Sequence, residues 1–390
     1  MKKILFSIIM LLLLSGCYNY NELNSYAIST GMAIDYEDDE FKVSFLISNS
    51  PKNNTVSTTE FQNVVYSGKG KSVFEAVKNI GLISAKELYI GHLSVVVVSE
   101  EAAKKGLLES LAFLVTEPQS KKDFVVVLAK NSDASDILKI TTPLTEFPSQ
   151  NISDNIKSTQ HLQASVVSVE FNTLLKTLVE KNKSPVLSSI SLVGSVKKGE
   201  SQKNIEYSTP KSYVKLNNLG IFKNDKFVAW ATKDESRGIN IINNDIREMY
   251  LNLNCGNGKV VINTEQFKTK IDVNKKGDIK INVNSNAIIN EIACDFNIKD
   301  EKNIKKLEKK ASKKIKSFID KAIKLSKKYN TDIFGFGLEY YRNYEKEYKK
   351  IKDWDKYYKN INIDTNIKVN IKHNGASQQS IERIYNEKDN

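Results

Sequence analysis

The side chain with the most recognisable chemistry in this sequence is the thiol of Cys17. It ends the run Leu14-Ser15-Gly16-Cys17, which fits the bacterial lipobox, where the thiol receives diacylglycerol and cleavage leaves the cysteine as the first residue. Lys2 and Lys3 precede an apolar run that is too short to span a bilayer as a helix. We therefore predict a lipoprotein signal peptide at residues 1–16 and lipidation at Cys17, on the outer face of a cytoplasmic membrane. The alternative is an ordinary secreted protein with a chance cysteine near the cleavage site.

The two remaining cysteines, Cys255 and Cys294, offer a second kind of chemistry. Outside the membrane, a disulfide between them is chemically allowed. Two cysteines in a chain of this length do not make a disulfide scaffold, so the sequence leaves a bridge and two free thiols both open.

No set of residues in the sequence predicts an enzyme. The histidines lie far apart and belong to no catalytic or metal-binding motif: His92, His161 and His373. Residues 67–72 resemble a phosphate-binding loop, but Val65 stands where that loop needs its first glycine. Ser72 and Glu75 are better explained as a capping box at the start of a helix. We therefore predict no catalytic residue, no cofactor and no bound metal.

Positive charge is concentrated in one stretch of the chain. The formal net charge is +12, and residues 299–328 hold 13 lysines against four carboxylates. The whole sequence has only four arginines, the side chain that most often reads nucleic-acid bases, so we predict no nucleic-acid partner. The lysines indicate either a patch for anionic lipid headgroups or the solvated face of a helix.

Strand and helix signals alternate through the first half of the chain. Residues 94–98 and 124–129 are almost entirely apolar and rich in valine, as in strands that are buried on both faces. Helical patterns occur before, between and after these strands, at 72–80, 100–115, 133–140, 151–162 and 165–181. We expect a mixed α/β region at 17–193, as one unit or two subdomains. Residues 194–213 are polar, contain glycine and proline, and are expected to link two domains.

The second half, residues 214–374, reads as an α+β domain. We expect a hairpin at 216–231, a helix from Thr232 to about Tyr250, and three or four antiparallel strands over 259–298. The lysine-rich stretch is predicted to be a long helix, because apolar residues recur in it every three or four positions: Ile304, Leu307, Ala311, Ile315, Phe318, Ala322, Leu325 and Tyr329.

The chain is expected to end with a second helix reaching Tyr358, a strand at 361–371 and a polar tail at 375–390. The predicted fold class is therefore α+β. It is a multi-domain mixed α/β chain with an antiparallel sheet and long helices in its C-terminal domain.

Four stretches of the sequence resemble one family of exported proteins. In chain order they are 16–24 with 31–35, 91–101, 219–222 with Trp230 and 235–238, and Asp332-Ile333-Phe334-Gly335-Phe336-Gly337 followed by Trp354. On these landmarks, which span nearly the whole mature chain, the sequence resembles the C subunits of spore germinant receptors, the Ger(x)C lipoproteins. One departure is Tyr18-Asn19-Tyr20, where the family often has tryptophan and charged residues.

The resemblance implies a function that the residues alone do not reveal. It implies an accessory C subunit, needed for spore germination, that works in the spore inner membrane beside a polytopic A subunit and a permease-like B subunit. It also implies a multi-domain α+β fold without a catalytic site, and it assigns a role to Cys17 alone. The alternative is a solute-binding lipoprotein of a membrane transporter. That class has two similar α/β lobes around a cleft, and the largely antiparallel second half counts against it.

Overall fold

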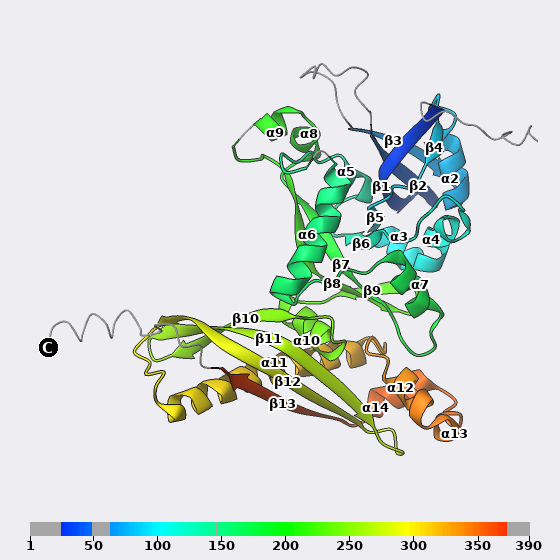
Figure 1. The fold of residues 1–390 in the computed structure, drawn as a ribbon. Helices are drawn as coiled ribbons and strands as arrows, with labels where there is room; N and C mark the ends of the chain where they lie inside the picture. Colours follow the sequence, from blue (N-terminus) through cyan, green and yellow to red (C-terminus); the bar gives the residue numbers. More distant parts are fainter. Residues whose placement is uncertain (1–24, 49–62, 146, 207, 373–390) are drawn as a thin grey trace, which may run out of the picture.

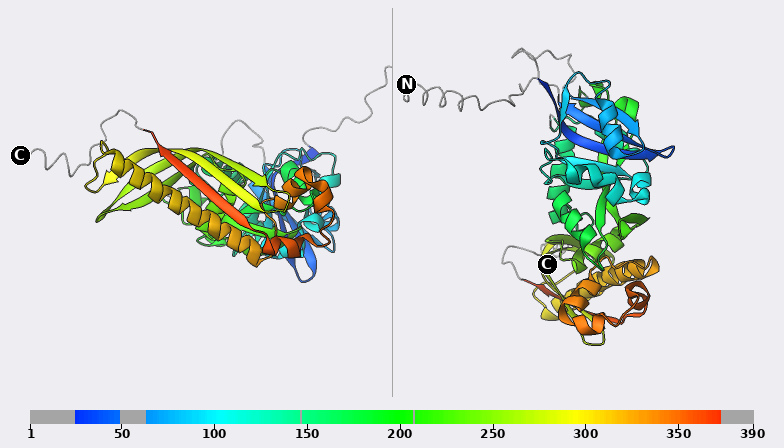
Figure 2. Two further views of the ribbon diagram at one scale, coloured as in Figure 1. Left: turned by 90° about the horizontal axis from the view of Figure 1, so that it is seen from below. Right: turned by 90° about the vertical axis from the view of Figure 1, so that its right-hand side faces the viewer.

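Two β-sheets form the body of the molecule, and the second sheet lies across one end of the first (Figure 1 and Figure 2). The computed structural model describes residues 25–48, 63–145, 147–206 and 208–372. The predicted signal peptide at 1–16, Cys17 and the predicted tail at 375–390 lie outside these residues. The α+β fold class is confirmed.

Within the described residues, the first sheet has nine strands, with parallel strands at its centre and antiparallel pairs at its ends. The strand order is β3-β2-β1-β5-β6-β7-β8-β9, and β4 pairs with the beginning of β1. The strands are β1 (Tyr26–Glu37), β2 (Glu40–Ser48), β3 (Asn63–Gly70), β4 (Glu87–Tyr89), β5 (Val95–Ser99), β6 (Val125–Ala129), β7 (Val186–Val193), β8 (Tyr213–Lys223) and β9 (Lys226–Trp230). The predicted buried strands are confirmed as β5 and β6, in which every residue is buried.

Helices cover both faces of this sheet, which is why its central strands can be apolar throughout (Figure 1). One face carries α2 (Val73–Ile80), α3 (Glu100–Lys105), α4 (Leu107–Thr116) and α7 (Phe171–Val179); the other carries α5 (Ala134–Leu138) and α6 (Pro148–Gln163). The expected single helix at 100–115 is wrong. Gly106 has a φ of +143°, which ends α3 before α4 begins.

Residues 194–213 connect two neighbouring strands of the first sheet. They include the short helices α8 (Val196–Gly199) and α9 (Lys203–Glu206), and β7 before them pairs antiparallel with β8 after them. The hairpin that was expected to open the second half is β8 and β9, and it completes the first sheet. The polar composition of these residues predicts a linker between domains. The structure instead places them between two strands of the first sheet, because β7 and β8 pair with each other and composition alone cannot predict that pairing. The chain passes from one sheet to the other at α10 (Lys233–Ile242).

The second sheet has four described strands in the order β10-β11-β12-β13. They are β10 (Glu248–Cys255), β11 (Gly258–Val273), β12 (Ile279–Ala293) and β13 (Ile363–Ile371), and only β13 runs parallel to its neighbour. The expected three or four strands over 259–298 are two long strands. The reason is a bulge in β11 around Gln266, with a φ of +55°, which interrupts the alternating pattern as a strand end would. The helix expected to reach Tyr250 ends at Ile242, and β10 follows it.

The long helix α11 (Glu301–Lys328) packs its predicted apolar stripe against the second sheet (Figure 2). Its polar side chains reach both edges of that sheet. Lys310 and Lys314 donate to carbonyl oxygens of β10, while Glu308 and Ser312 accept from backbone N–H groups of β13. These contacts satisfy edge groups that would otherwise be open to pairing with another chain. The expected second helix is three shorter ones, α12 (Phe336–Asn343), α13 (Glu345–Tyr348) and α14 (Trp354–Asn360).

Candidate functional site at the junction of the two sheets

A buried carboxylate organises the turn between α11 and α12. Oδ1 of Asp332 accepts hydrogen bonds from the backbone N–H groups of Phe334, Gly335 and Phe336, over 2.9–3.3 Å. Its Oδ2 accepts from the N–H of Gly337 at 2.8 Å and from the indole Nε1 of Trp354 at 3.1 Å. Burial raises the pKa of Asp332 to about 6, although these donors lower it in part. All five donors bind Asp332, which is only 4% exposed, so this buried carboxylate stabilises the turn.

The two glycines of this turn are required by its geometry. Gly335 has a φ of +75°, in the left-handed region that glycine adopts without strain. At Gly337 a Cβ atom would lie 2.6 Å from the Cβ of Asn182 and 2.6 Å from the ring of Trp354. The Asp-Ile-Phe-Gly-Phe-Gly run and the later tryptophan therefore form one local structure.

This turn is hydrogen-bonded to the first sheet and to the loop that leads into it. The hydroxyl of Thr331 donates to the carbonyl of Phe222, at the end of β8, over 2.6 Å. The N–H of Ser184, just before β7, donates to the carbonyl of Asp332 over 2.8 Å. The Ser184 hydroxyl in turn accepts from the N–H of Asn224, in the β8–β9 turn. The turn after α11 is thus fixed to the end of β8 and to the loop that precedes β7.

Helix α10 forms the other half of the junction. Its predicted start is confirmed as a capping box between Thr232 and Glu235. The hydroxyl of Ser236 accepts from the N–H of Leu219 in β8, and the side-chain amide of Asn240 donates to carbonyls that follow α6. At Gly238 a Cβ atom would lie 2.1 Å from the carbonyl oxygen of Phe318, so α10 crosses α11 in direct backbone contact.

Trp230 fixes the end of β9 to the beginning of α3. Its Nε1 donates to Glu100, at the start of α3, over 2.9 Å, and the Nζ of Lys130 lies over its ring at 5.0 Å. A Cβ atom at Gly220, the partner of Trp230 in the β8–β9 pair, would lie 2.5 Å from Leu128. Trp230 and Gly220 of the third sequence landmark are therefore structural parts of the first sheet, whereas the fourth landmark forms the junction turn.

One continuous apolar core runs through the junction. Leu219, Ile221 and Ala229 of the first sheet belong to the same cluster of buried side chains as Phe318, Phe336 and Trp354 of the C-terminal half. A shared core and shared hydrogen bonds hold the two sheets in one arrangement, whereas a hinge needs few contacts across it. We therefore regard the molecule as a rigid platform rather than two lobes that close on each other.

The lysine-rich face of α11 is partly used inside the protein. Lys316 donates to Thr365, Lys321 pairs with Asp234, and Lys327 donates to the carbonyl of Ile361. Together with Lys310 and Lys314, these side chains fix the helix to strands and to α10. These five lysines already have partners within the protein, so fewer lysines of α11 are left to contact lipid headgroups.

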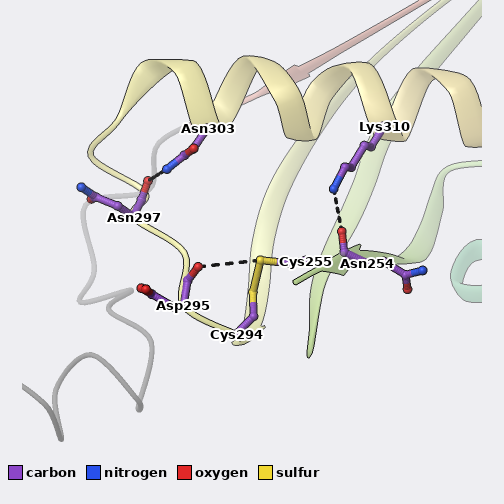
Figure 3. Close-up of a disulfide and its surroundings, with 7 residues drawn as sticks. All are labelled: Asn254, Cys255, Cys294, Asp295, Asn297, Asn303 and Lys310. Atoms are coloured by element: carbon purple, nitrogen blue, oxygen red, sulfur yellow. Dashed lines mark hydrogen bonds between the residues drawn. A yellow bond between two sulfur atoms is a disulfide. The ribbon is translucent and has the colours of Figure 1, made fainter. Parts of the chain in front are cut away.

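A disulfide joins Cys255 and Cys294 in the structure (Figure 3). Cys255 ends β10 and Cys294 follows β12, so the bond ties two strands that lie on either side of β11. The Cα atoms are 6.1 Å apart, within the range that a disulfide spans without backbone movement. Figure 3 shows the bond beside the segment that leads into α11, close to the contact between Lys310 and Asn254.

The phosphate-loop-like stretch and His92, the other candidates from the sequence, have roles or contacts within the fold. The hydroxyl of Ser72 accepts from the N–H of Glu75, which confirms the predicted helix cap, and Gly68 and Gly70 let β3 pack directly on α2. His92 is exposed, with its ring 5.7 Å from that of Tyr89. His373 and the side chain of His161 lie outside the described residues. Among the residues that the structure describes, no group of three or more histidine, cysteine, aspartate or glutamate side chains could hold a metal ion.

The sequence marks the run that begins at Asp332 but predicts no role for the Asp332 carboxylate itself. The signal was present in the residue types: a carboxylate followed by Gly335 and Gly337 can accept from several N–H groups of a tight turn. The donor from Trp354 could not be foreseen, because it depends on how α14 packs. The carboxylate of Asp332 and the indoles of Trp230 and Trp354 are thus all engaged in hydrogen bonds within the fold.

Comparison with known proteins agrees with the motifs. The family model described as the spore germination protein N-terminal domain matches residues 19–192, and the one described as spore germination B3/GerAC like, C-terminal, matches residues 217–375. The chain belongs to the spore germination GerAC family. The Ger(x)C resemblance stated from the sequence is confirmed.

Members of the GerAC family align with nearly the whole chain. It is 28% identical to spore germination protein KC of Bacillus subtilis (strain 168) over 406 residues, which covers 98% of this chain and 99% of the relative. It is 21% identical to the putative spore germination protein YfkR of the same organism, over 97% and 98% of the two chains. The crystal structure of the GerBC protein matches the fold with a TM-score of 0.53 and 16% identity, over 91% of this chain and all of that one.

Proposed function

We propose that this protein is the accessory C subunit of a nutrient germinant receptor, anchored by acylated Cys17 to the outer face of the spore inner membrane. Its partners in this proposal are the polytopic A and B subunits of the same receptor, and its contribution is a binding surface rather than catalysis. The observation that carries the proposal is the match of both GerAC family models, in order, to the two halves of the chain.

Membrane attachment in this proposal depends on lipid. No helix in the described part of the chain is long and apolar enough to cross a membrane. A diacylglycerol group on Cys17 would supply two acyl chains, and each buried CH₂ group contributes about 0.8 kcal/mol. Two chains suffice for stable anchoring, whereas a single chain binds reversibly.

The solute-binding alternative receives no support from the fold. That class needs two similar lobes with a ligand cleft between them. Here the nine-stranded and four-stranded sheets differ in topology, and the junction between them is filled by a shared apolar core. We therefore do not propose delivery of a solute to a transporter.

Affinity purification tests the proposed assembly. A C-terminal tag on the full chain would be used to recover the protein from detergent-solubilised spore membranes, with identification by mass spectrometry. We expect two polytopic germination subunits to be recovered with it. Recovery of transporter subunits, or of the tagged chain alone after mild cross-linking, would contradict the proposal.

The anchor is tested separately with Cys17→Ala, which removes the thiol that would receive the lipid. We expect the variant to leave the membrane fraction and spores that carry it to germinate slowly with nutrients. Tyr20→Ala, three residues away, keeps the thiol and serves as the matched control. If Cys17→Ala stays on the membrane after a high-salt wash, lipidation is not what holds the protein there.

A further inference from the structure

Two large aliphatic side chains stand exposed on the turn that follows α2. Leu82 is 82% exposed and Ile83 is 58% exposed, whereas Ile80, two positions before Leu82, is 1% exposed. The turn is well ordered by its own backbone: the N–H groups of residues 82, 83 and 84 donate to the carbonyls of Asn79 and Ile80 over 3.0–3.2 Å. The fold therefore holds two adjacent aliphatic side chains outward at one fixed point of the surface.

The turn lies at the end of the molecule where the described chain begins. It leads into β4, which pairs in parallel with the first residues of β1: Tyr26 is opposite Glu87, and Ile28 is opposite Tyr89. Figure 1 shows α2 and β4 at the end of the first sheet that is remote from the second sheet. The exposed pair therefore lies four residues before a strand that pairs with Tyr26–Ile28, the first residues of β1.

The proposed anchor lies close to this point along the chain. Cys17 precedes Tyr26 by nine residues, and a fully extended chain spans at most about 3.5 Å per residue, or about 30 Å. If Cys17 is acylated, the beginning of β1 therefore lies within about 30 Å of the lipid that holds the chain.

We propose that Leu82 and Ile83 insert into the boundary between headgroups and acyl chains of the membrane that holds Cys17. This inference rests on the lipid anchor of the proposed function and adds a second, non-covalent contact that fixes the orientation of the body. Amphipathic helices bind membranes at the same depth, with their apolar side chains at the boundary between headgroups and acyl chains.

Aromatic side chains beside the turn suit the same surface. The ring of Tyr89 lies 5.6 Å from that of Tyr26 and 5.7 Å from that of His92. Tyrosine rings are enriched at membrane–water interfaces, because they present an apolar body and a polar end.

The charged side chains around the turn balance one another. Lys78 and Lys86 are exposed, and so are Glu75 and Glu87. A contact made here is driven by the apolar pair rather than by net charge. It should therefore depend little on the fraction of anionic lipid or on salt.

Site-specific fluorescence tests the insertion. The full-length acylated chain with Leu82→Cys would be labelled with the environment-sensitive dye NBD and reconstituted in phosphatidylethanolamine–phosphatidylglycerol vesicles. Since Cys17 is acylated and Cys255 is bonded to Cys294, the new thiol is the one that reacts. We expect blue-shifted emission and loss of fluorescence when lipids carry a spin label high on the acyl chain.

The matched control is Val179→Cys at the end of α7, which is 77% exposed and is expected to stay in water. Both positions are exposed, so neither label should alter thermal unfolding. Vesicle flotation separates the two proposals. If the protein floats with vesicles but the dye at position 82 is no more quenched than at 179, the insertion is wrong and the anchor stands. If the acylated protein does not float, both proposals fail.

Discussion

The indole Nε1 of Trp354 donates a hydrogen bond to Oδ2 of Asp332, 22 residues earlier in the chain. This contact is one of five hydrogen bonds to the Asp332 carboxylate, and it connects α14 to the turn after α11. Because the same turn is bonded to Phe222 and Ser184, the pair links the C-terminal helices to the first sheet. It acts together with the shared apolar core and the hydrogen bonds of α10, which also join the two sheets.

Replacing Asp332 by asparagine should weaken the junction. Asparagine keeps one acceptor oxygen and places an NH₂ group against the N–H of Gly337 and the indole of Trp354, so two buried hydrogen bonds are lost. We expect Asp332→Asn to lower the free energy of unfolding by about 1–3 kcal/mol. Urea unfolding measures this. Asp364→Asn, at an exposed position in β13, is the control, and equal stability of the two variants would contradict the role of Asp332.

The stability of the protein should fall as pH rises through about 6. Burial raises the pKa of Asp332 to about 6 and also raises that of Asp35, so the folded state holds protons that the unfolded chain releases near pH 3.8. The stabilisation is complete below pH 3.8 and is lost as pH rises through the folded pKa. A carboxyl group whose pKa rises from 3.8 in the unfolded chain to about 6 in the folded state contributes about 3 kcal/mol.

Urea unfolding between pH 4.5 and 7.5 measures this dependence. The Asp332→Asn variant lacks the titrating group and should show a shallower slope over the same range. Identical slopes for the two proteins would mean that Asp332 does not titrate there.

Gly238→Ala should disrupt the crossing of α10 over α11. The added methyl group would lie 2.1 Å from the carbonyl oxygen of Phe318, and neither helix can yield without disturbing the shared core. We expect a loss of about 1–3 kcal/mol or more, despite the better helix propensity of alanine. Gly81→Ala is the matched control, because its Cβ would approach only the carbonyl of Lys78, at 3.1 Å. Thermal unfolding of both variants decides the matter, and a fully stable Gly238→Ala protein would exclude close packing here.

The bond between Cys255 and Cys294 should stabilise the C-terminal sheet. It closes a loop with a sequence separation of 39, for which disulfides typically contribute about 2–4 kcal/mol. We expect the double variant Cys255→Ser with Cys294→Ser to unfold at lower urea concentration by that amount. Non-reducing peptide mapping of the native protein should recover the linked peptides. Two free thiols in spore-derived protein would show that the bridge does not form in the cell.

Local patterns determined much of the architecture. Continuous valine runs indicated the buried strands β5 and β6, the spacing of apolar residues indicated α11, and the capping boxes at Ser72 and Thr232 indicated two helix starts. These features depend on side chains within one or two turns of each other, so the sequence carries them directly. The family followed from the order of short motifs along the chain.

Tertiary structure alone decided how the pieces combine. That residues 194–213 connect paired strands, that Trp354 binds Asp332, and that Gly238 touches Phe318 all depend on contacts between distant segments. Pairing of strands and packing of helices are chosen by the whole core, because each local signal is compatible with several partners. For the same reason the sequence could mark the glycines and the aspartate of the junction, but only the folded chain brought them together.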